Sequence, residues 1–295
     1  MRPMTRYQRI FFLSLVALLV GATFVGAQQN NEDFIVSFLP TEIEFNPIIT
    51  YTTSEAQIYT GLYEGLVSYD PFSLDPIPAV ASRWEILDDG LRYRFYLRED
   101  AKYSNGDPVL AEHFRSTWLR MLDPETDAAY ASLFDMVEGA HAYRSGENND
   151  PSAVGIKVIS NRILEIRLAR RATHLLRILC HHRFVVVHPD MLDGGNWETP
   201  ADIPYNGPYV LTEIRDPSTD GGEIVLQANA EYWDARRLEI ETIRIEFNED
   251  ADVVTEGFND GSIHWGRGGI DFGNIDSSES LVINPLFATT YYQLS

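Results

Sequence analysis

The stretch "LCHHRFVVVH", residues 179–188, gathers Cys180, His181, His182 and His188, whose side chains are all potential zinc ligands. Adjacent histidines on an extended segment point to opposite faces, so His181 and His182 are not expected to face one ion together. No His-x-x-x-His or Cys-x-x-Cys pair completes a tetrahedral set nearby. The spacing therefore favours a buried strand start, with a polar residue or two facing a cleft, over a metal site.

Other catalytic patterns are also missing from the sequence. It contains no G-x-S-x-G nucleophile elbow, no phosphate-binding P-loop and no G-x-G-x-x-G dinucleotide motif. The glycine-rich run at 266–269 lacks the following helix that a phosphate site needs. Carboxylates are abundant, but the sequence does not pair them into an acid–base couple. We therefore expect a protein that is not an enzyme and that carries no metal and no cofactor.

The elements that must position these residues are mostly short. In "LRYRFYLR", residues 91–98, apolar and charged positions alternate, which predicts a half-buried strand. A helix is predicted from Asp107 as N-cap and Pro108 as first helical residue to the stop at Asp123-Pro124. A second helix is predicted at 251–260, closed by Gly261. Further strands are predicted at 153–159, 163–169, 184–188, 208–214, 223–229 and 241–247.

The first 27 residues have the pattern of a secretory signal peptide. Arginines at positions 2, 6 and 9 precede an apolar core at 10–20, and Val25-Gly26-Ala27 forms a small-x-small cleavage site. The alternative is an uncleaved anchor helix, which Gly21 and Gly26 disfavour because they interrupt the apolar run. We expect cleavage after Ala27 and a periplasmic protein.

The remaining 268 residues favour two domains, and their charge excludes some partners. Without the three arginines of the signal peptide, 20 basic residues stand against 44 acidic ones, a formal charge of −24. A surface this negative repels nucleic acid and anionic lipid. Cys180 is the sole cysteine of the sequence, so no intramolecular disulfide can form.

Several sequence blocks, taken in order, resemble a known family. "IYTGLYEGLVSYD" and the following "PIPAVASRWEILDDGLRYRFYLREDAKYSNGDPVLAEHF" are similar to the start of the family 5 extracellular solute-binding proteins, the oligopeptide, dipeptide and nickel receptors of ABC importers. The matching residues are Tyr63-Glu64-Gly65-Leu66, Pro78-Ala79, Trp84, Asp89-Gly90, Phe95, Leu97-Arg98 and Gly106. Blocks at 122–143, 205–214, 229–234 and 258–266 follow in the family's order. The block at 262–264 departs from the family, because Ser-Ile-His stands where an acidic residue is usual.

The oligopeptide-binding branch is the one that "DPETDAAYAS" most resembles, and this implies a peptide ligand held in a cleft between two lobes. The resemblance implies that backbone groups of Tyr51, Thr52 and Thr53 pair with the peptide in β-fashion. By the same resemblance Tyr130 lies against the peptide and His181 lines a side-chain pocket. The alternative for Tyr130 is an ordinary core residue.

Across the cleft, the resemblance implies a strand and loop edge made by Trp265, Arg267 and Gly268. The alternative for Arg267 is a solvated surface charge. The partners implied are a peptide ligand and the ABC permease subunits of the inner membrane, with the receptor acting as a monomer that binds no nucleic acid.

The fold implied is α/β, type II periplasmic-binding-protein-like: lobe I with an inserted subdomain. After the signal peptide at 1–27, the base of the lobe would be discontinuous, at 28–66 and 189–290, with the subdomain at 67–188. Residues 291–295 would start a hinge strand. We expect the second lobe of the family to be missing, so that the chain is a truncated form.

Two alternatives to a peptide receptor stay open. The same scaffold could bind another solute, such as a nickel chelate, haem or a sugar. The other is an exported metal-dependent hydrolase built around Cys180 and the histidines. The closing segment 283–295, "INPLFATTYYQLS", has the composition of a strand and is interpreted as the hinge strand that would cross into the second lobe.

Overall fold

The computed structural model describes residues 33–50, 52–192 and 194–276. The predicted signal peptide and the predicted closing strand at 283–295 lie outside the described residues. The chain divides into Met1–Asp33 and Phe34–Ser295, and the elements below belong to the second part. Within the described ranges, no helix combines the length and the apolar character needed to cross a membrane.

A five-stranded mixed sheet joins the two ends of this part of the chain. Its order is β11-β1-β10-β9-β8, and β1 pairs in parallel with both β10 and β11, whereas β9 pairs antiparallel with β10 and β8. The strands are β1 (Phe34–Phe38), β8 (Tyr209–Arg215), β9 (Gly222–Ala228), β10 (Thr242–Phe247) and β11 (Trp265–Arg267). The first strand therefore lies between two strands from the far end of the described chain.

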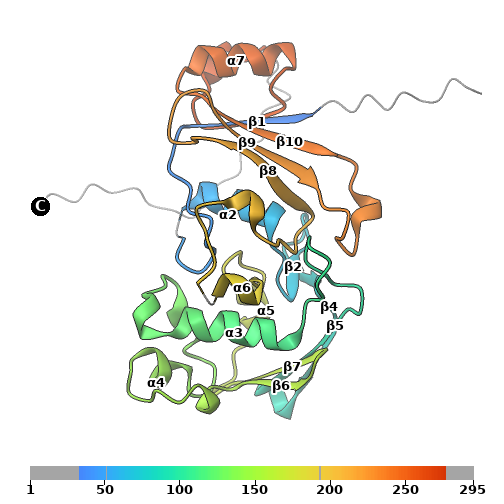
Figure 1. Cartoon of the computed structure of the whole chain (residues 1–295), viewed down its shortest axis with the longest axis vertical. Helices are drawn as coiled ribbons and strands as arrows, with labels where there is room; N and C mark the ends of the chain where they lie inside the picture. The colour runs from blue at the N-terminus through green and yellow to red at the C-terminus, as the bar shows by residue number, and fades with distance from the viewer. Residues whose placement is uncertain (1–32, 51, 193, 277–295) are drawn as a thin grey trace, which may run out of the picture. The chain divides into compact units, whose positions relative to one another are not determined.

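Two helices flank this sheet. Figure 1 shows α7 (Ala251–Asp260) and α2 (Thr53–Leu62) on opposite sides of it. The predicted helix at 251–260 is confirmed, and Gly261 ends it in the left-handed conformation, with φ of 83°. On the other side, α2 approaches the sheet at Gly61, where an added Cβ would lie 3.6 Å from Leu226. The sheet thus has helical cover on each side.

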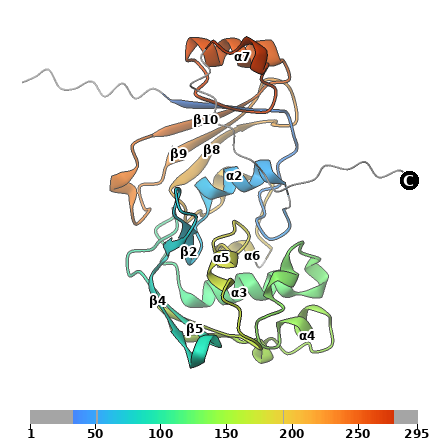
Figure 2. The ribbon, with the colours of Figure 1, turned by 180° about the vertical axis from the view of Figure 1, so that it is seen from behind.

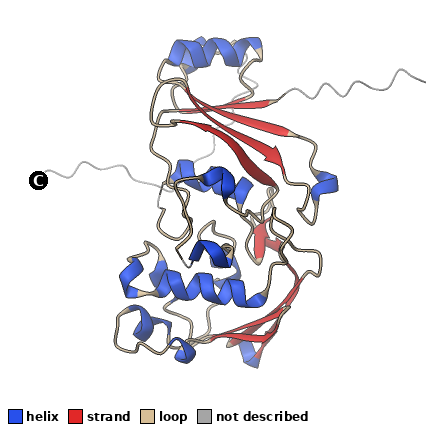
Figure 3. Ribbon diagram, in the orientation of Figure 1, coloured by secondary structure: helices blue, strands red, loops and turns tan. Residues whose placement is uncertain are grey.

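A second, four-stranded antiparallel sheet is formed by consecutive parts of the chain. Its order is β4-β5-β7-β6, and α3 (Ala111–Leu122) packs against it, as Figure 2 shows. On β5, Tyr93, Phe95 and Leu97 are buried in alternation, as the sequence pattern predicts. The strands are β4 (Ala81–Leu87), β5 (Arg92–Leu97), β6 (Ile156–Ser160) and β7 (Ile163–Arg167). Short elements complete the fold: β2 (Val67–Tyr69), β3 (Pro76–Pro78), α4 (Ala140–Arg144), α5 (Leu175–Leu179) and α6 (Pro189–Leu192) (Figure 3).

Aromatic side chains form the centre of the core around α3. The ring of Trp118 meets Phe114 and Phe134 edge to face, with centroids 5.5 and 5.2 Å apart. Phe134 in turn stacks on Phe184 at 4.5 Å. Offset and edge-to-face pairs of this kind add stability beyond the burial of apolar area. They fix α3 against the segment that carries the histidines.

Two sequence predictions about this region are wrong. The helix begins at Ala111, because Asp107 holds a turn instead of a cap: its carboxylate accepts from Asn105 Nδ2 at 2.7 Å. The predicted strand at 184–188 is also absent, since Val185 makes an isolated bridge with Gly65 and its neighbours join no sheet. An apolar run such as 184–187 is buried both in a sheet strand and in an unpaired extended segment, so composition alone does not separate the two.

We predict opposite effects for two alanine substitutions where α2 meets the start of β8. A Cβ on Gly207 would lie 2.5–2.7 Å from backbone atoms of Gly61 and Leu62, so Gly207→Ala should lower the free energy of unfolding by about 1–3 kcal/mol. Gly61→Ala is the matched control, because its Cβ meets side chains at 3.6 Å or more and alanine favours the helix by about 0.5–1 kcal/mol. Urea unfolding of both variants checks this, and equal effects would contradict the geometry.

Candidate functional site

Thr52 and Glu55 shape the beginning of α2. Thr52 is the N-cap, and its hydroxyl accepts from the backbone N–H of Glu55 at 3.2 Å. The Glu55 carboxylate accepts in return from the backbone N–H of Thr52 at 2.8 Å, from Glu44 N–H at 3.1 Å and from the Thr50 hydroxyl. Burial alone would raise the pKa of Glu55, but these hydrogen bonds hold it below the ordinary value. The carboxylate therefore ties the preceding loop to the helix.

This cap engages the backbone groups of Thr52 that were expected to pair with the ligand. Its N–H donates to Glu55, and its carbonyl accepts from Ala56 N–H at 3.2 Å, so both backbone groups already have a partner within the chain. Tyr51 lies outside the described residues. Thr53 is the first helical residue, and as such its N–H belongs to the turn that has no acceptor within the helix. Ligand contact by these residues stays a prediction, carried best by Thr53.

Arg267 connects β11 to the first turn of α2. Its Nη1 donates to Ser54 Oγ at 3.2 Å and to Gln57 Oε1 at 3.0 Å, and its Nη2 donates to Thr53 Oγ1. The structure therefore brings two of the predicted site residues, Thr53 and Arg267, into direct contact. The guanidinium is a fixed link between strand and helix, and not a freely solvated charge.

The other two residues predicted on this edge lie beside Arg267. Trp265 is 41% exposed, and its ring meets Phe38 edge to face at 6.0 Å. Gly268 has φ of 74°, and an added Cβ would lie 3.2 Å from Leu39. Since β11 pairs with β1 and with no other described strand, it presents the backbone groups of a sheet edge.

Tyr130 and His181 form a second group. Their ring centroids are 5.6 Å apart, and Tyr130 is 46% exposed with a left-handed φ of 68°. A tyrosine in this conformation carries strain, which is found more often at functional sites than elsewhere. Tyr130 is therefore not an ordinary core residue. A contact between this pair and the group around Arg267 is not seen.

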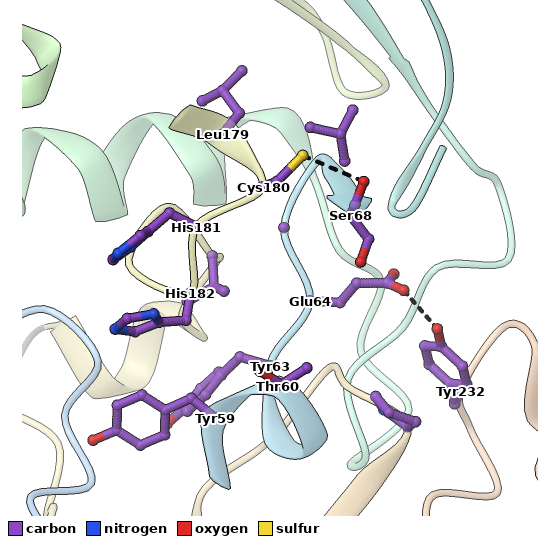
Figure 4. Close-up of a pocket in the computed structure, with 14 residues that line it drawn as sticks. Tyr59, Thr60, Tyr63, Glu64, Ser68, Leu179, Cys180, His181, His182 and Tyr232 are labelled. Carbon is purple, nitrogen blue, oxygen red and sulfur yellow. Dashed lines mark hydrogen bonds between the residues drawn. The ribbon is translucent and has the colours of Figure 1, made fainter. Parts of the chain in front are cut away.

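His181 also lines a cavity of about 190 Å³, which Figure 4 shows in close-up. His181 and His182 form one wall, while Glu64 and Tyr232 form another. The remaining lining residues are Tyr59, Thr60, Tyr63, Gly65, Val67, Ser68, Leu179, Cys180, Val185 and Pro208. This placement agrees with the predicted role of His181 beside a pocket, although the ligand contact itself stays a prediction.

The histidines do not point apart as expected. The rings of His181 and His182 stack at 4.1 Å, because the chain turns here and does not run extended. Burial lowers the pKa of both imidazoles, that of His182 to about 4, so both are neutral at pH 7. The Cys180 thiol donates to the carbonyls of Ser68 and Leu176, and burial raises its pKa to about 11. Among the described residues, no three His, Cys, Asp or Glu side chains are placed to hold a metal ion.

Glu64 is a functional candidate that sequence reasoning missed. Its carboxylate accepts from the Tyr232 hydroxyl at 2.5 Å and from Trp233 Nε1 at 2.8 Å. Burial raises the pKa of Glu64 to about 7, against the opposing effect of these two hydrogen bonds. The resemblance includes Glu64 in a matching block, but nothing in the sequence shows which residues receive its side chain.

Arg183 is the second residue that was missed. It is 2% exposed, and its Nη1 donates at 3.2 Å to the carbonyls of Ile48 and Ala129. It thereby joins the loop before α2 to the segment that carries Tyr130. A charged residue directly after two histidines gives no sequence signal of burial, since arginine is usually exposed.

Residues 75–292 match the family described as bacterial extracellular solute-binding proteins, family 5 Middle. The periplasmic oligopeptide-binding protein OppA of Escherichia coli is 31% identical over 231 residues, which are 76% of this chain and 40% of that protein. The probable deoxycholate-binding periplasmic protein YgiS of Escherichia coli is 33% identical over 220 residues, 73% of this chain and 39% of that protein.

The fold is similar to that of OppA from Burkholderia pseudomallei, with a TM-score of 0.72 and 28% identity over 80% of this chain and 46% of that structure. This likeness confirms the predicted α/β class of the periplasmic-binding-protein type. The chain spans about two fifths of the length of the curated relatives that it matches.

We predict that Glu64 makes stability fall as pH rises. Between its ordinary value of 4.5 and its folded pKa of about 7, the folded state keeps a proton that the unfolded state has lost, so stability decreases through this window. Glu64→Gln removes the titrating group and keeps two hydrogen bonds, because the glutamine amide can accept from Trp233 and donate to Tyr232. The free energy of unfolding of the variant, relative to that of the parent, should rise by about 2 kcal/mol between pH 5 and pH 8.

Urea unfolding at several pH values measures this difference. Glu256→Gln is the control, since it removes an exposed carboxylate from α7. Parallel pH profiles for the parent and Glu64→Gln would contradict the assignment.

Proposed function

The chain belongs to the bacterial extracellular solute-binding proteins of family 5, and from this membership we propose that it captures oligopeptides as the substrate-binding component of an ABC importer. The observation that carries the proposal is the likeness, over three quarters of the chain, to a protein named for oligopeptide binding. Its role is capture and delivery, not chemical conversion of the ligand.

Two features of the site support an extended peptide as ligand. The β11 edge has backbone groups on one side that no described strand uses, and a peptide can add to such an edge as a further strand. The exposed ring of Tyr130 and the cavity beside His181 then offer side-chain contacts at a second place. Backbone pairing with few side-chain demands suits a receptor for many peptides.

The relatives' greater length bears on how the ligand would be held. We propose that the chain forms lobe I of such a receptor, with its base at 28–66 and 189–290, its inserted subdomain at 67–188 and the start of a hinge strand at 291–295. In a two-lobed receptor the ligand is enclosed when the lobes close around a hinge. Thr53, Tyr130, His181, Trp265, Arg267 and Gly268 would then form one wall of the cleft.

The proposed setting follows from the same membership. The receptor works as a monomer in the periplasm, to which a cleavable signal peptide directs it, and hands its ligand to permease subunits of the inner membrane. Its strongly negative charge disfavours nucleic acid as a partner.

A different solute is the second candidate, and the resemblance to a probable deoxycholate-binding protein favours including it. In that case an amphipathic carboxylic acid would take the place of the peptide. Nickel chelates, haem and sugars have no comparable observation among the described residues.

We expect the purified chain to bind tri- to pentapeptides with a Kd near 1 mM, because one wall of a cleft buries too little of the ligand for tight binding. Two-dimensional NMR titration with a random peptide pool measures this. The shifts should cluster at the first turn of α2, at β11 and around Tyr130 and His181. Deoxycholate titrated in parallel separates the second candidate.

Position-specific outcomes decide between these ideas. Shifts confined to the outer strands of the four-stranded sheet, or saturation by deoxycholate and not by peptides, would overturn peptide capture. Thr53→Val should weaken peptide binding severalfold, because it removes the hydroxyl that accepts from Arg267 and so loosens this part of the wall. Thr219→Val, in the loop between β8 and β9, is the control and should leave binding unchanged.

A further inference from the structure

Arg183 is a buried cation whose hydrogen-bonding capacity is less than half used. Its Nε and Nη2 are buried and have no hydrogen-bond partner in the part of the chain that the structure describes. No carboxylate oxygen of the described residues forms an ion pair with it, and Nη1 alone donates, to Ile48 and Ala129. Burying a charge without a partner is strongly destabilising, so such a group calls for an explanation.

No neighbouring charge among the described residues pairs directly with Arg183. The Glu55 carboxylate acts on the guanidinium from a distance, but its oxygens are engaged by Glu44, Thr50 and Thr52. His181 and His182 are neutral at pH 7 and supply no counter-charge. Although burial lowers the pKa of Arg183, a guanidinium stays protonated in proteins. The guanidinium therefore stays charged, with no carboxylate of the described residues in direct contact with it.

The two unused donors are chemically specific. Nε–H and one N–H of Nη2 lie on the same edge of the planar guanidinium and point the same way. This is the edge that receives both oxygens of a carboxylate in a bidentate pair, the strongest arginine interaction. Water can occupy one donor at a time, but a carboxylate matches both the geometry and the charge.

The ring of Tyr130 lies over this guanidinium. The guanidinium carbon lies 4.8 Å from the centroid of the Tyr130 ring, and that ring is 46% exposed. His181 lies next to the ring, at 5.6 Å. A group that binds against Tyr130 and His181 therefore lies close to the charge of Arg183.

We propose that Tyr130, His181 and Arg183 form a subsite for a carboxylate of the ligand, with Arg183 as its counter-charge. The inference rests on the proposed function where it takes the ligand to be a peptide, and adds to it a preference for an anionic group. That carboxylate is either an acidic side chain or the peptide's C-terminus.

Matched peptide pools distinguish the two sources. One pair of tetrapeptide pools carries Glu or Gln at each position in turn, and the other pair ends in a free acid or an amide. The carboxylate member of at least one pair should bind about tenfold more tightly, as for a charge-assisted hydrogen bond. Arg183→Gln should reduce this ratio to within twofold, and Arg183→Lys should keep part of it, since it keeps the charge without the fork.

The control is Arg236→Gln, which removes the same charge from an exposed position and should leave the ratio unchanged. Thermal unfolding of each variant shows whether it is folded. Equal binding of both members of both pairs by the parent chain would overturn the carboxylate subsite and leave peptide capture standing.

A further experiment without peptides tests the carboxylate subsite independently of peptide capture. Formate and its neutral counterpart formamide are titrated at constant ionic strength while the Nε–Hε resonance of Arg183 is followed by NMR. The resonance is assigned by its loss in Arg183→Gln. A saturable shift with formate alone supports the subsite even if no peptide binds, which would sink peptide capture. The absence of a shift with formate overturns the subsite.

Discussion

The rest of the structure depends on how the chain is held at Glu64 and Gly65, between α2 and β2. The side chain of Asn206 accepts from Glu64 N–H at 3.1 Å and donates to its carbonyl at 2.9 Å, as a second strand would. The carboxylate at the same position receives Tyr232 and Trp233. A Cβ on Gly65 would lie 3.3 Å from two backbone carbonyl oxygens. Three distant parts of the chain therefore converge on two residues. This junction sets where α2 points, and hence where its first turn meets β11.

The sequence predicted the structure correctly wherever a short pattern is compatible with only one local conformation. Strict alternation at β5 and the glycine after α7 each have a single physical reading, and both predictions are confirmed. The start of α3 could not be predicted, because Asp107-Pro108 suits both a helix cap and a tight turn. Contacts far along the chain decided between them: the Asp107 carboxylate lies 3.2 Å from His188 Nε2. Local chemistry offers two solutions here, and tertiary packing selects one.

The site was predictable only as far as the family resemblance identified positions. It indicated Thr53, Arg267, Tyr130 and His181, but not that the first two contact each other or that the second two form a separate group. The partners of these residues are 51 positions away for Tyr130 and His181 and 214 for Thr53 and Arg267, where no period or spacing carries information. Arg183 shows the limit most clearly. Its candidate role follows from the N–H donors that have no partner after folding, and these can be identified only in the folded chain.

The parallel pairing of β1 has a consequence for the order of folding. Ile35 N–H donates to His264 Nδ1 at 3.0 Å across a separation of 229 positions, so the five-stranded sheet closes a very long loop. The four-stranded sheet comes from a continuous stretch, 81–167, and its contacts are far more local. Since local contacts form faster, we expect the segment 81–167 to fold first. Before the segment 242–267 has folded, β1 is an unpaired apolar strand that can pair with other chains.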